Sequence, residues 1–141
     1  MHPNSQKAYH ELAYYTLSHP SAEFIHQYVV DTFTIQTADE TNKPISIVFA
    51  LAGLFLFSEK GFTGKQVQLA HIRMTKNKIN WPELVLPVHR GTISIQDVLA
   101  IPEGNERDLL IASWCRDTWE HCIGLKGIIT TVLIQAGVLD E

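Results

Sequence analysis

The feature that most constrains the fold is one apolar stretch, residues 45–57, interrupted only by Ser46 and Gly53. As a helix rising about 1.5 Å per residue it would be roughly 20 Å long, short of the roughly 30 Å hydrocarbon core of a bilayer. A helix that is apolar on every side must be surrounded by other parts of the fold. We therefore predict a buried central helix, with the other elements packed around it, and no association with a membrane.

Turn and cap signals predict further helices on both sides of this one. Pro44 and Gly61 bound the central helix, and Thr63 with Gln66 and Ser94 with Asp97 have the spacing of capping boxes. We expect helices over about 6–17, 20–37, 44–60, 63–78, 94–101, 105–123 and 126–138, with Asn4 or Ser5 capping the first and Asn105 capping the sixth. Residues 81–90, which contain two prolines, are expected to be non-helical. The prediction is an all-α fold, a single-domain bundle of about six to seven helices spanning residues 1–141.

Composition narrows the functional classes. The 141 residues are 45% hydrophobic and 18% charged, enough to bury a core, and the formal charge of -4 excludes a general nucleic-acid binder. The first residues lack the basic and apolar regions of a secretory signal. Cys115 and Cys122 would lie about 10 Å apart along a helix, too far for a disulfide. We expect a cytoplasmic protein in which both cysteines act as small buried hydrophobes.

Several polar residues fall on apolar helix faces. On the helix expected from residue 20, His26 and Gln36 lie among valines and phenylalanines, whereas Asp31 lies on the polar side or at its edge. His71 lies beside apolar neighbours on the fourth helix, and His121 lies at the boundary of the core face of the sixth. That core face is formed by Ile111, Trp114, Cys115, Trp119 and Cys122. Burying such a polar group without a partner costs about 1–3 kcal/mol, so each one needs an explanation.

Two interpretations of these residues remain open. In the first, each inward histidine or glutamine satisfies a backbone carbonyl or a neighbouring side chain. In the second, they converge on one internal pocket that binds a small molecule or a divalent metal, with acid–base chemistry through a histidine. The second interpretation assigns His26 and His71 as catalytic residues, Asp31, Gln36 and Trp119 as ligand-binding residues, and His26, His71, His121 and Glu59 as metal ligands. A Glu-x-x-His pair occurs once, at Glu23 and His26, and Glu23 lies on the polar side, which argues against a di-iron bundle.

The alternative function is an interaction module or a homodimer subunit without chemistry of its own. The aromatic residues that would supply its interface are Tyr9, Tyr14, Tyr15, Trp81, Trp114 and Trp119. Core packing is the other explanation for the same side chains.

Five stretches of the chain resemble a family of short bacterial all-helical proteins that have no assigned function. The stretches are 26–36 (His, then Val-Asp, an aromatic residue and Gln), 54–61, Trp81-Pro82, 91–98 and 114–121. The resemblance covers about residues 24–122 and implies a helical fold and these site residues, without an activity. In that family a histidine usually follows the glutamine, and this chain has Thr37 there; it also lacks the N-terminal cysteine pair of many members.

Overall fold

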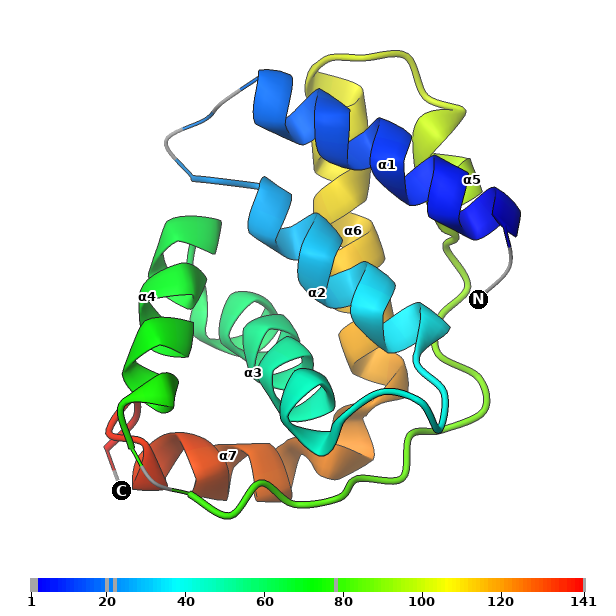
Figure 1. Cartoon of the computed structure of the whole chain (residues 1–141). Coiled ribbons are helices and arrows are strands. Elements are labelled where there is room, and N and C mark those ends of the chain that lie inside the picture. Colours follow the sequence, from blue (N-terminus) through cyan, green and yellow to red (C-terminus); the bar gives the residue numbers. More distant parts are fainter. Residues whose placement is uncertain (1–2, 20, 22, 78, 141) are drawn as a thin grey trace.

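The structure, a computed structural model, describes residues 3–19, 21, 23–77 and 79–140. Over these residues the chain forms seven α-helices and no strand, which confirms the all-α prediction (Figure 1). The elements are α1 (Pro3–Ser18), α2 (His26–Thr37), α3 (Pro44–Lys60), α4 (Gly64–Thr75), α5 (Ile95–Leu99), α6 (Asn105–His121), a 3₁₀ turn η1 (Ile123–Leu125) and α7 (Lys126–Gln135).

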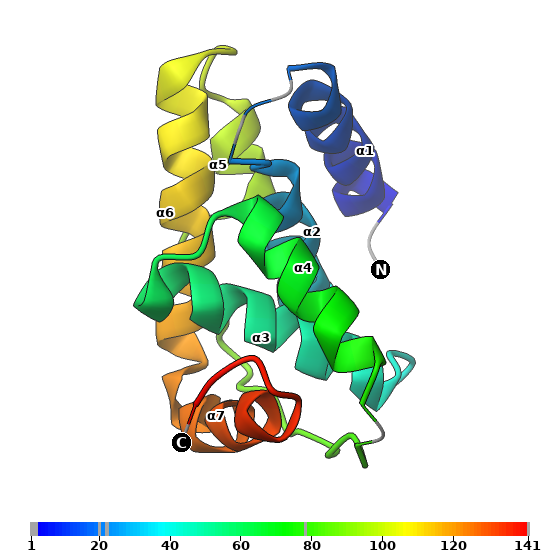
Figure 2. The same cartoon turned by 90° about the vertical axis from the view of Figure 1, so that its left-hand side faces the viewer.

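The apolar helix α3 lies at the centre, as predicted. It contacts α2, α4, α6 and α7, and an unbroken run of its residues, 50–56, is buried. Figure 2 shows α4 in front of α3 and α7 below it. The helix begins at Pro44 and ends at Gly61, whose φ of 71° is the left-handed conformation that glycine adopts without strain. Within the described part of the chain, no helix combines the length and the apolar character that crossing a bilayer requires.

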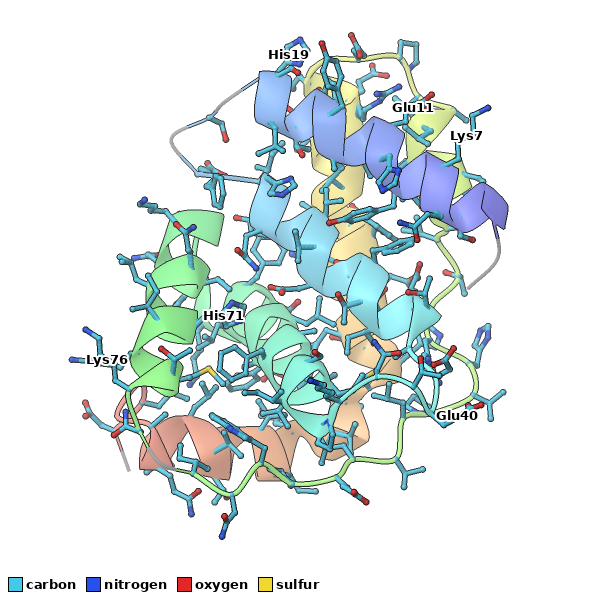
Figure 3. The ribbon with its side chains drawn as sticks, viewed as in Figure 1. Lys7, Glu11, His19, Glu40, His71 and Lys76 are labelled. Atoms are coloured by element: carbon cyan, nitrogen blue, oxygen red, sulfur yellow. The ribbon has the colours of Figure 1, made fainter. Side chains whose placement is uncertain are left out.

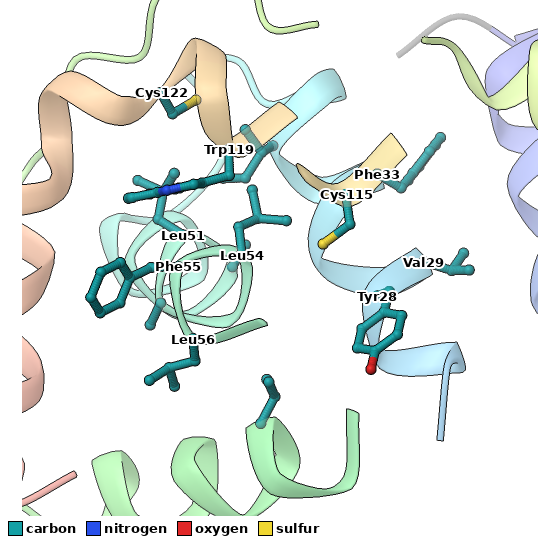
Figure 4. Close-up of a cluster of buried hydrophobic side chains, with 14 of the residues drawn as sticks. Tyr28, Val29, Phe33, Leu51, Leu54, Phe55, Leu56, Cys115, Trp119 and Cys122 are labelled. Atoms are coloured by element: carbon teal, nitrogen blue, oxygen red, sulfur yellow. The ribbon is translucent and has the colours of Figure 1, made fainter. Parts of the chain in front are cut away.

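The core joins α3 to α2 and α6. Trp119 lies against Leu51 and Phe55 of α3, and Cys115 faces the side of α2 (Figure 4). Cys115 and Cys122 are both buried and free, and burial raises the pKa of their thiols to about 12 and about 11 respectively. Both therefore stay protonated at neutral pH, as the sequence predicts for small buried hydrophobes.

The second helix begins later than predicted. Pro20 lies outside the described residues, and α2 starts at His26. Phe24 adopts a φ of 55°, and the carbonyl of Glu23 accepts a hydrogen bond of 3.1 Å from the amide of Lys65 at the start of α4. The segment before α2 is thus bonded to α4 rather than continuing the helix backwards.

Both predicted capping boxes are present, at Thr63 with Gln66 and at Ser94 with Asp97. The sixth helix differs in detail, because Asn105 is its first residue and Gly104, with a φ of 134°, precedes it. The fourth helix ends at Thr75, and Lys78 of the predicted end lies outside the described residues.

The segment from residue 79 to residue 93 is non-helical and connects α4 to α5. It passes below α7 and then along the side of the bundle (Figure 1). Trp81, Leu84 and Leu86 pack against the core, whereas Val85 and Val88 are 90% and 100% exposed. This extended segment carries several of the residues that form the site described next.

Candidate functional site

Gln36, near the end of α2, is bonded to two other parts of the fold. Its carbonyl oxygen accepts from the indole N–H of Trp114 at 2.9 Å. Its amide nitrogen donates to the carbonyl of Ile93 at 2.9 Å and to the hydroxyl of Thr118 at 3.1 Å. One side chain therefore joins α2, α6 and the end of the extended segment, and its burial is fully compensated.

The loop of residues 90–94, which we call the Gly91 loop, is held from α6 by Asp117. The Asp117 carboxylate accepts from the backbone amides of Thr92 at 2.7 Å and Ile93 at 2.9 Å. Gly91 has a φ of 136°, and a Cβ atom there would lie 2.8 Å from Asp117 and 3.0 Å from Gln36. The loop thus approaches both side chains so closely that only glycine fits without a shift.

Arg90 fixes the same loop to the end of α2. Its Nη1 donates to the carbonyls of Ile35 and Ala38, at 3.0 and 2.7 Å, and its Nε donates to the carbonyl of Pro87 at 2.7 Å. Carbonyls at a helix C-terminus lack partners within the helix, so a guanidinium at this position satisfies them.

Arg90 lines two open hollows. One, of about 450 Å³, is lined by Ala38, Asp39, Glu40, Asn42, Pro44, Ile47, Glu83, Leu84, Leu86 and Arg90. The other, of about 430 Å³, is lined by Gln36, Val88 and residues 90–94. Both volumes fall in the range of small-molecule sites, about 300–1,000 Å³.

His121, a predicted metal ligand, lies at the edge of this region. Its Nδ1 is 2.9 Å from the backbone carbonyl of Asp117, one turn earlier on α6. The imidazole of His89 lies against it, with ring centroids 4.9 Å apart and planes at 80°. No pattern in the sequence singles out His89, because it lies in a segment without helical periodicity.

His26 and His71 lie elsewhere. Nδ1 of His26 is 2.9 Å from the hydroxyl of Thr16 on α1, and Nε2 of His71 is 2.8 Å from the carbonyl of Phe49 on α3. Figure 3 shows His71 on α4, on the side that faces α3. Burial lowers the pKa of both imidazoles, so both are neutral at pH 7. Each imidazole therefore has a local hydrogen-bond partner, as the first interpretation, in which the inward side chains are satisfied locally, expects.

Asp31 departs most from its predicted position. The helical wheel places it on the polar side of α2 or at its edge, but it is only 4% exposed, because α2 is packed against α1, α3, α4 and α6. Among the described residues, its one hydrogen-bond partner is the side-chain amide of Gln27, at 3.1 Å. Its carboxyl group lies so close to Gly53 of α3 that a methyl group at Gly53 would overlap it. Burial raises the pKa of Asp31 well above its usual range.

Glu59 and Trp119 are bonded to each other. The indole N–H of the fully buried Trp119 donates to Glu59 at 2.6 Å, and Lys126, at the start of α7, pairs with the other carboxylate oxygen at 2.6 Å. The bond from Lys126, followed by that from Trp119, lowers the pKa of Glu59. These contacts connect the end of α3 to α6 and α7.

The predicted residues therefore do not meet in one internal pocket. His26 and Gln36 are ten residues apart on α2, about 15 Å along its axis. Among the described residues, no group of three or more His, Cys, Asp or Glu side chains is arranged to hold a metal ion. Of the predicted set, Gln36 and His121 lie at the Gly91 loop. Arg90, Gly91, Asp117 and Thr118 complete this site. The sequence alone does not reveal them, because only the fold brings residues 36, 90–94 and 114–121 together.

A comparison with protein families bears on these same segments. The profile of a family described as "Family of unknown function (DUF5946)" matches residues 3–122. The chain belongs to this family. The match includes every segment of the Gly91 loop site and ends before α7. It confirms the resemblance, drawn from the sequence, to a family without an assigned function. Comparisons with curated proteins and with solved structures gave no match.

Proposed function

We propose that this member of the DUF5946 family is a small-molecule-binding protein whose site is the hollow of about 450 Å³ beside Arg90. The observation that carries the proposal is its rigid frame. Arg90 is bonded to the end of α2 and to Pro87, so one side chain fixes both walls of the hollow. A preformed concave surface of this volume is typical of ligand sites.

The lining indicates the ligand's chemistry. Ala38 and Ile47 are buried and Leu84 and Leu86 are half-buried, so they offer an apolar surface to a hydrocarbon group. The exposed carboxylates of the lining are Asp39, Glu40 and Glu83, and Glu40 lies on the loop between α2 and α3 (Figure 3). Three carboxylates outnumber the single guanidinium of Arg90, which is engaged with carbonyls. A small organic cation with an apolar body matches this combination.

Nuclear magnetic resonance tests this proposal. Backbone amide spectra are recorded with hexylamine and with hexanoate as matched probes of opposite charge. We expect hexylamine to shift amides within 38–47 and 83–90, and Glu83→Gln to weaken the response. Glu11→Gln, at an exposed position on α1, is the control. Equal responses to both probes, or equal effects of both variants, would contradict the proposal.

A second candidate is an interface between two copies of the chain. Trp114 and Trp119 are fully buried and Tyr15 is 3% exposed, so these three aromatics belong to the core rather than to an interface. The outer side of α4 instead exposes Leu69 by 55% and Ile72 by 47%. Beside them is a hollow of about 310 Å³ lined by Phe62, Gln66, Leu69, Ala70, Arg73 and Val138.

Light scattering at micromolar concentration tests this second candidate. An interface on α4 predicts a dimer that Leu69→Glu dissociates. Leu109→Glu, at a 62% exposed leucine on α6, is the control and should leave the dimer intact. A monomeric wild-type protein would exclude an obligate dimer.

A further inference from the structure

His89 and His121 form a pair that neither the fold nor the proposed ligand site requires. Their rings are in edge contact, with centroids 4.9 Å apart, although they lie 32 positions apart in the sequence. His89 is exposed, and the His121 side chain is 27% exposed. Both imidazoles are therefore accessible to an ion from solvent.

The hydrogen bond of His121 sets which of its nitrogens can bind a metal. A backbone carbonyl only accepts, so Nδ1, 2.9 Å from the carbonyl of Asp117, carries the proton in the neutral ring. Nε2 then holds the free electron pair. This is the arrangement of most metal-binding histidines, in which the second nitrogen donates to a carbonyl or carboxylate that fixes the ring.

The chain on both sides of His89 is fixed in place. Arg90 bonds back to Pro87 at 2.7 Å and to the end of α2, and the amide of Thr92 donates to Asp117 at 2.7 Å. Asp117 lies one turn before His121 on α6, so the segments that carry the two histidines are bonded to each other. His89 itself makes no side-chain hydrogen bond with the described residues, which leaves its ring free to turn about its side-chain bonds.

From this geometry we infer that His89 and His121 bind one divalent transition-metal ion, such as Zn²⁺, Ni²⁺ or Cu²⁺, at the protein surface. Metal–nitrogen bonds are about 2.0–2.1 Å, so two nitrogens that share an ion lie within about 4 Å of each other, a separation that rings in contact can reach. Imidazole is a preferred ligand of these three metals.

Asp117 supports this site without joining it as a third ligand. One of its carboxylate oxygens accepts from two loop amides, and the other lies 3.2 Å from the Thr92 hydroxyl and 3.5 Å from Nδ1 of His121. The protein therefore supplies two ligands, in keeping with the absence of a three-residue metal group among the described residues. Water or a bound molecule completes the coordination.

Calorimetric titration of the tag-free chain with Zn²⁺ tests the inference. We expect one ion per chain, bound about tenfold or more weakly after either His89→Ala or His121→Gln. His10→Ala, which removes an exposed histidine of α1, is the matched control and should leave the affinity unchanged. Substoichiometric Cu²⁺ should broaden the imidazole resonances of His89 and His121 before those of His10 and His19. Equal broadening of all four, or an unchanged affinity in the His89 variant, would overturn the inference.

Discussion

Gln36 and Asp31 lie five residues apart on α2, but the number of hydrogen bonds that each side chain makes differs. Gln36 meets an indole N–H, a hydroxyl and a loop carbonyl, at 2.9, 3.1 and 2.9 Å. Asp31 lies against the backbone of α3 at Gly53 and, within the described part of the chain, accepts one hydrogen bond, from Gln27. The same helix thus has a polar residue with complete hydrogen bonding near its end and one with almost none at its middle.

The difference comes from what the neighbouring helices present. Near Gln36, α6 offers Trp114 and Thr118, and the Gly91 loop adds carbonyls from outside any helix. Beside Asp31, α3 offers a glycine, whose backbone groups are already bonded within the helix, and α4 offers Val67. A buried amide with partners stabilises the fold, whereas a buried carboxyl without them shifts its pKa to stay neutral.

The largest effect is expected from Gln36→Leu. It leaves the Trp114 indole N–H, the Ile93 carbonyl and the Thr118 hydroxyl without this partner, so the free energy of unfolding should fall by about 3–4 kcal/mol. Denaturant unfolding followed by circular dichroism measures this. Gln68→Leu, at a half-buried glutamine on α4, is a control that should change stability by less than about 1 kcal/mol. An equally small loss for Gln36→Leu would mean that these bonds do not hold the loop.

Gly53→Ala tests the contact between α3 and the Asp31 carboxyl. The added methyl group overlaps that carboxyl and lies 3.2 Å from Val67, so we expect a loss of about 2–3 kcal/mol. In an Asp31→Ala background, Gly53→Ala should lower the free energy of unfolding by clearly less. Gly127→Ala in α7, where a Cβ meets nothing within 4 Å, should instead stabilise by about 0.5–1 kcal/mol. Equal losses with and without Asp31 would show that the two residues do not touch.

Asp31→Asn tests the raised pKa of the buried carboxyl through the pH dependence of stability. Below the unfolded-state pKa, about 3.9, both states are protonated. As the pH rises from there through the raised pKa of the folded state, the unfolded chain loses the proton first, so Asp31 lowers stability across that window. Each unit of pKa difference corresponds to about 1.4 kcal/mol. The asparagine variant should therefore gain stability over the wild type as pH rises from 4 to 7, and parallel curves for the two proteins would contradict this.

The smallest effect is expected from His26→Gln at the start of α2. The side chain loses one bond, to Thr16, and glutamine can replace part of it, so about 1 kcal/mol should be lost. Thr16→Val should lose a similar amount, and the double variant less than the sum, because both changes remove the same bond. Unfolding midpoints of the three variants measure this. A larger loss that is additive would assign His26 a role beyond this bond.

Much of the fold follows from local sequence. The apolar stretch of α3, Gly61 at its end and the two capping boxes depend on neighbours within a few residues, so their positions were predictable. The start of α2 was not, because it depends on a bond between Glu23 and Lys65, which are distant in the sequence.

The site was less predictable, because a helical wheel describes one helix and not its surroundings. It marks Gln36 and His71 as inward-facing, but it places Asp31 on an outer side that does not exist for a helix with four neighbours. It also says nothing of His89, which lies in an extended segment and approaches His121 only in the folded chain. Helix packing decides which polar groups meet, and a single sequence does not specify that packing.

We conclude that α2 buries a carboxyl of raised pKa at Asp31, whereas Gln36, near the end of the same helix, has its amide fully hydrogen-bonded. A carbon-13 NMR titration of the aspartate carboxyl groups tests it most directly. Asp39, whose pKa is lowered chiefly by hydrogen bonds from the side chain and amide of Thr41, is an internal control that should ionise below the usual aspartate range. We predict that the Asp31 resonance stays at the protonated position well above that range. An Asp31 carboxyl that ionises within the usual aspartate range, about pH 4, would contradict the account.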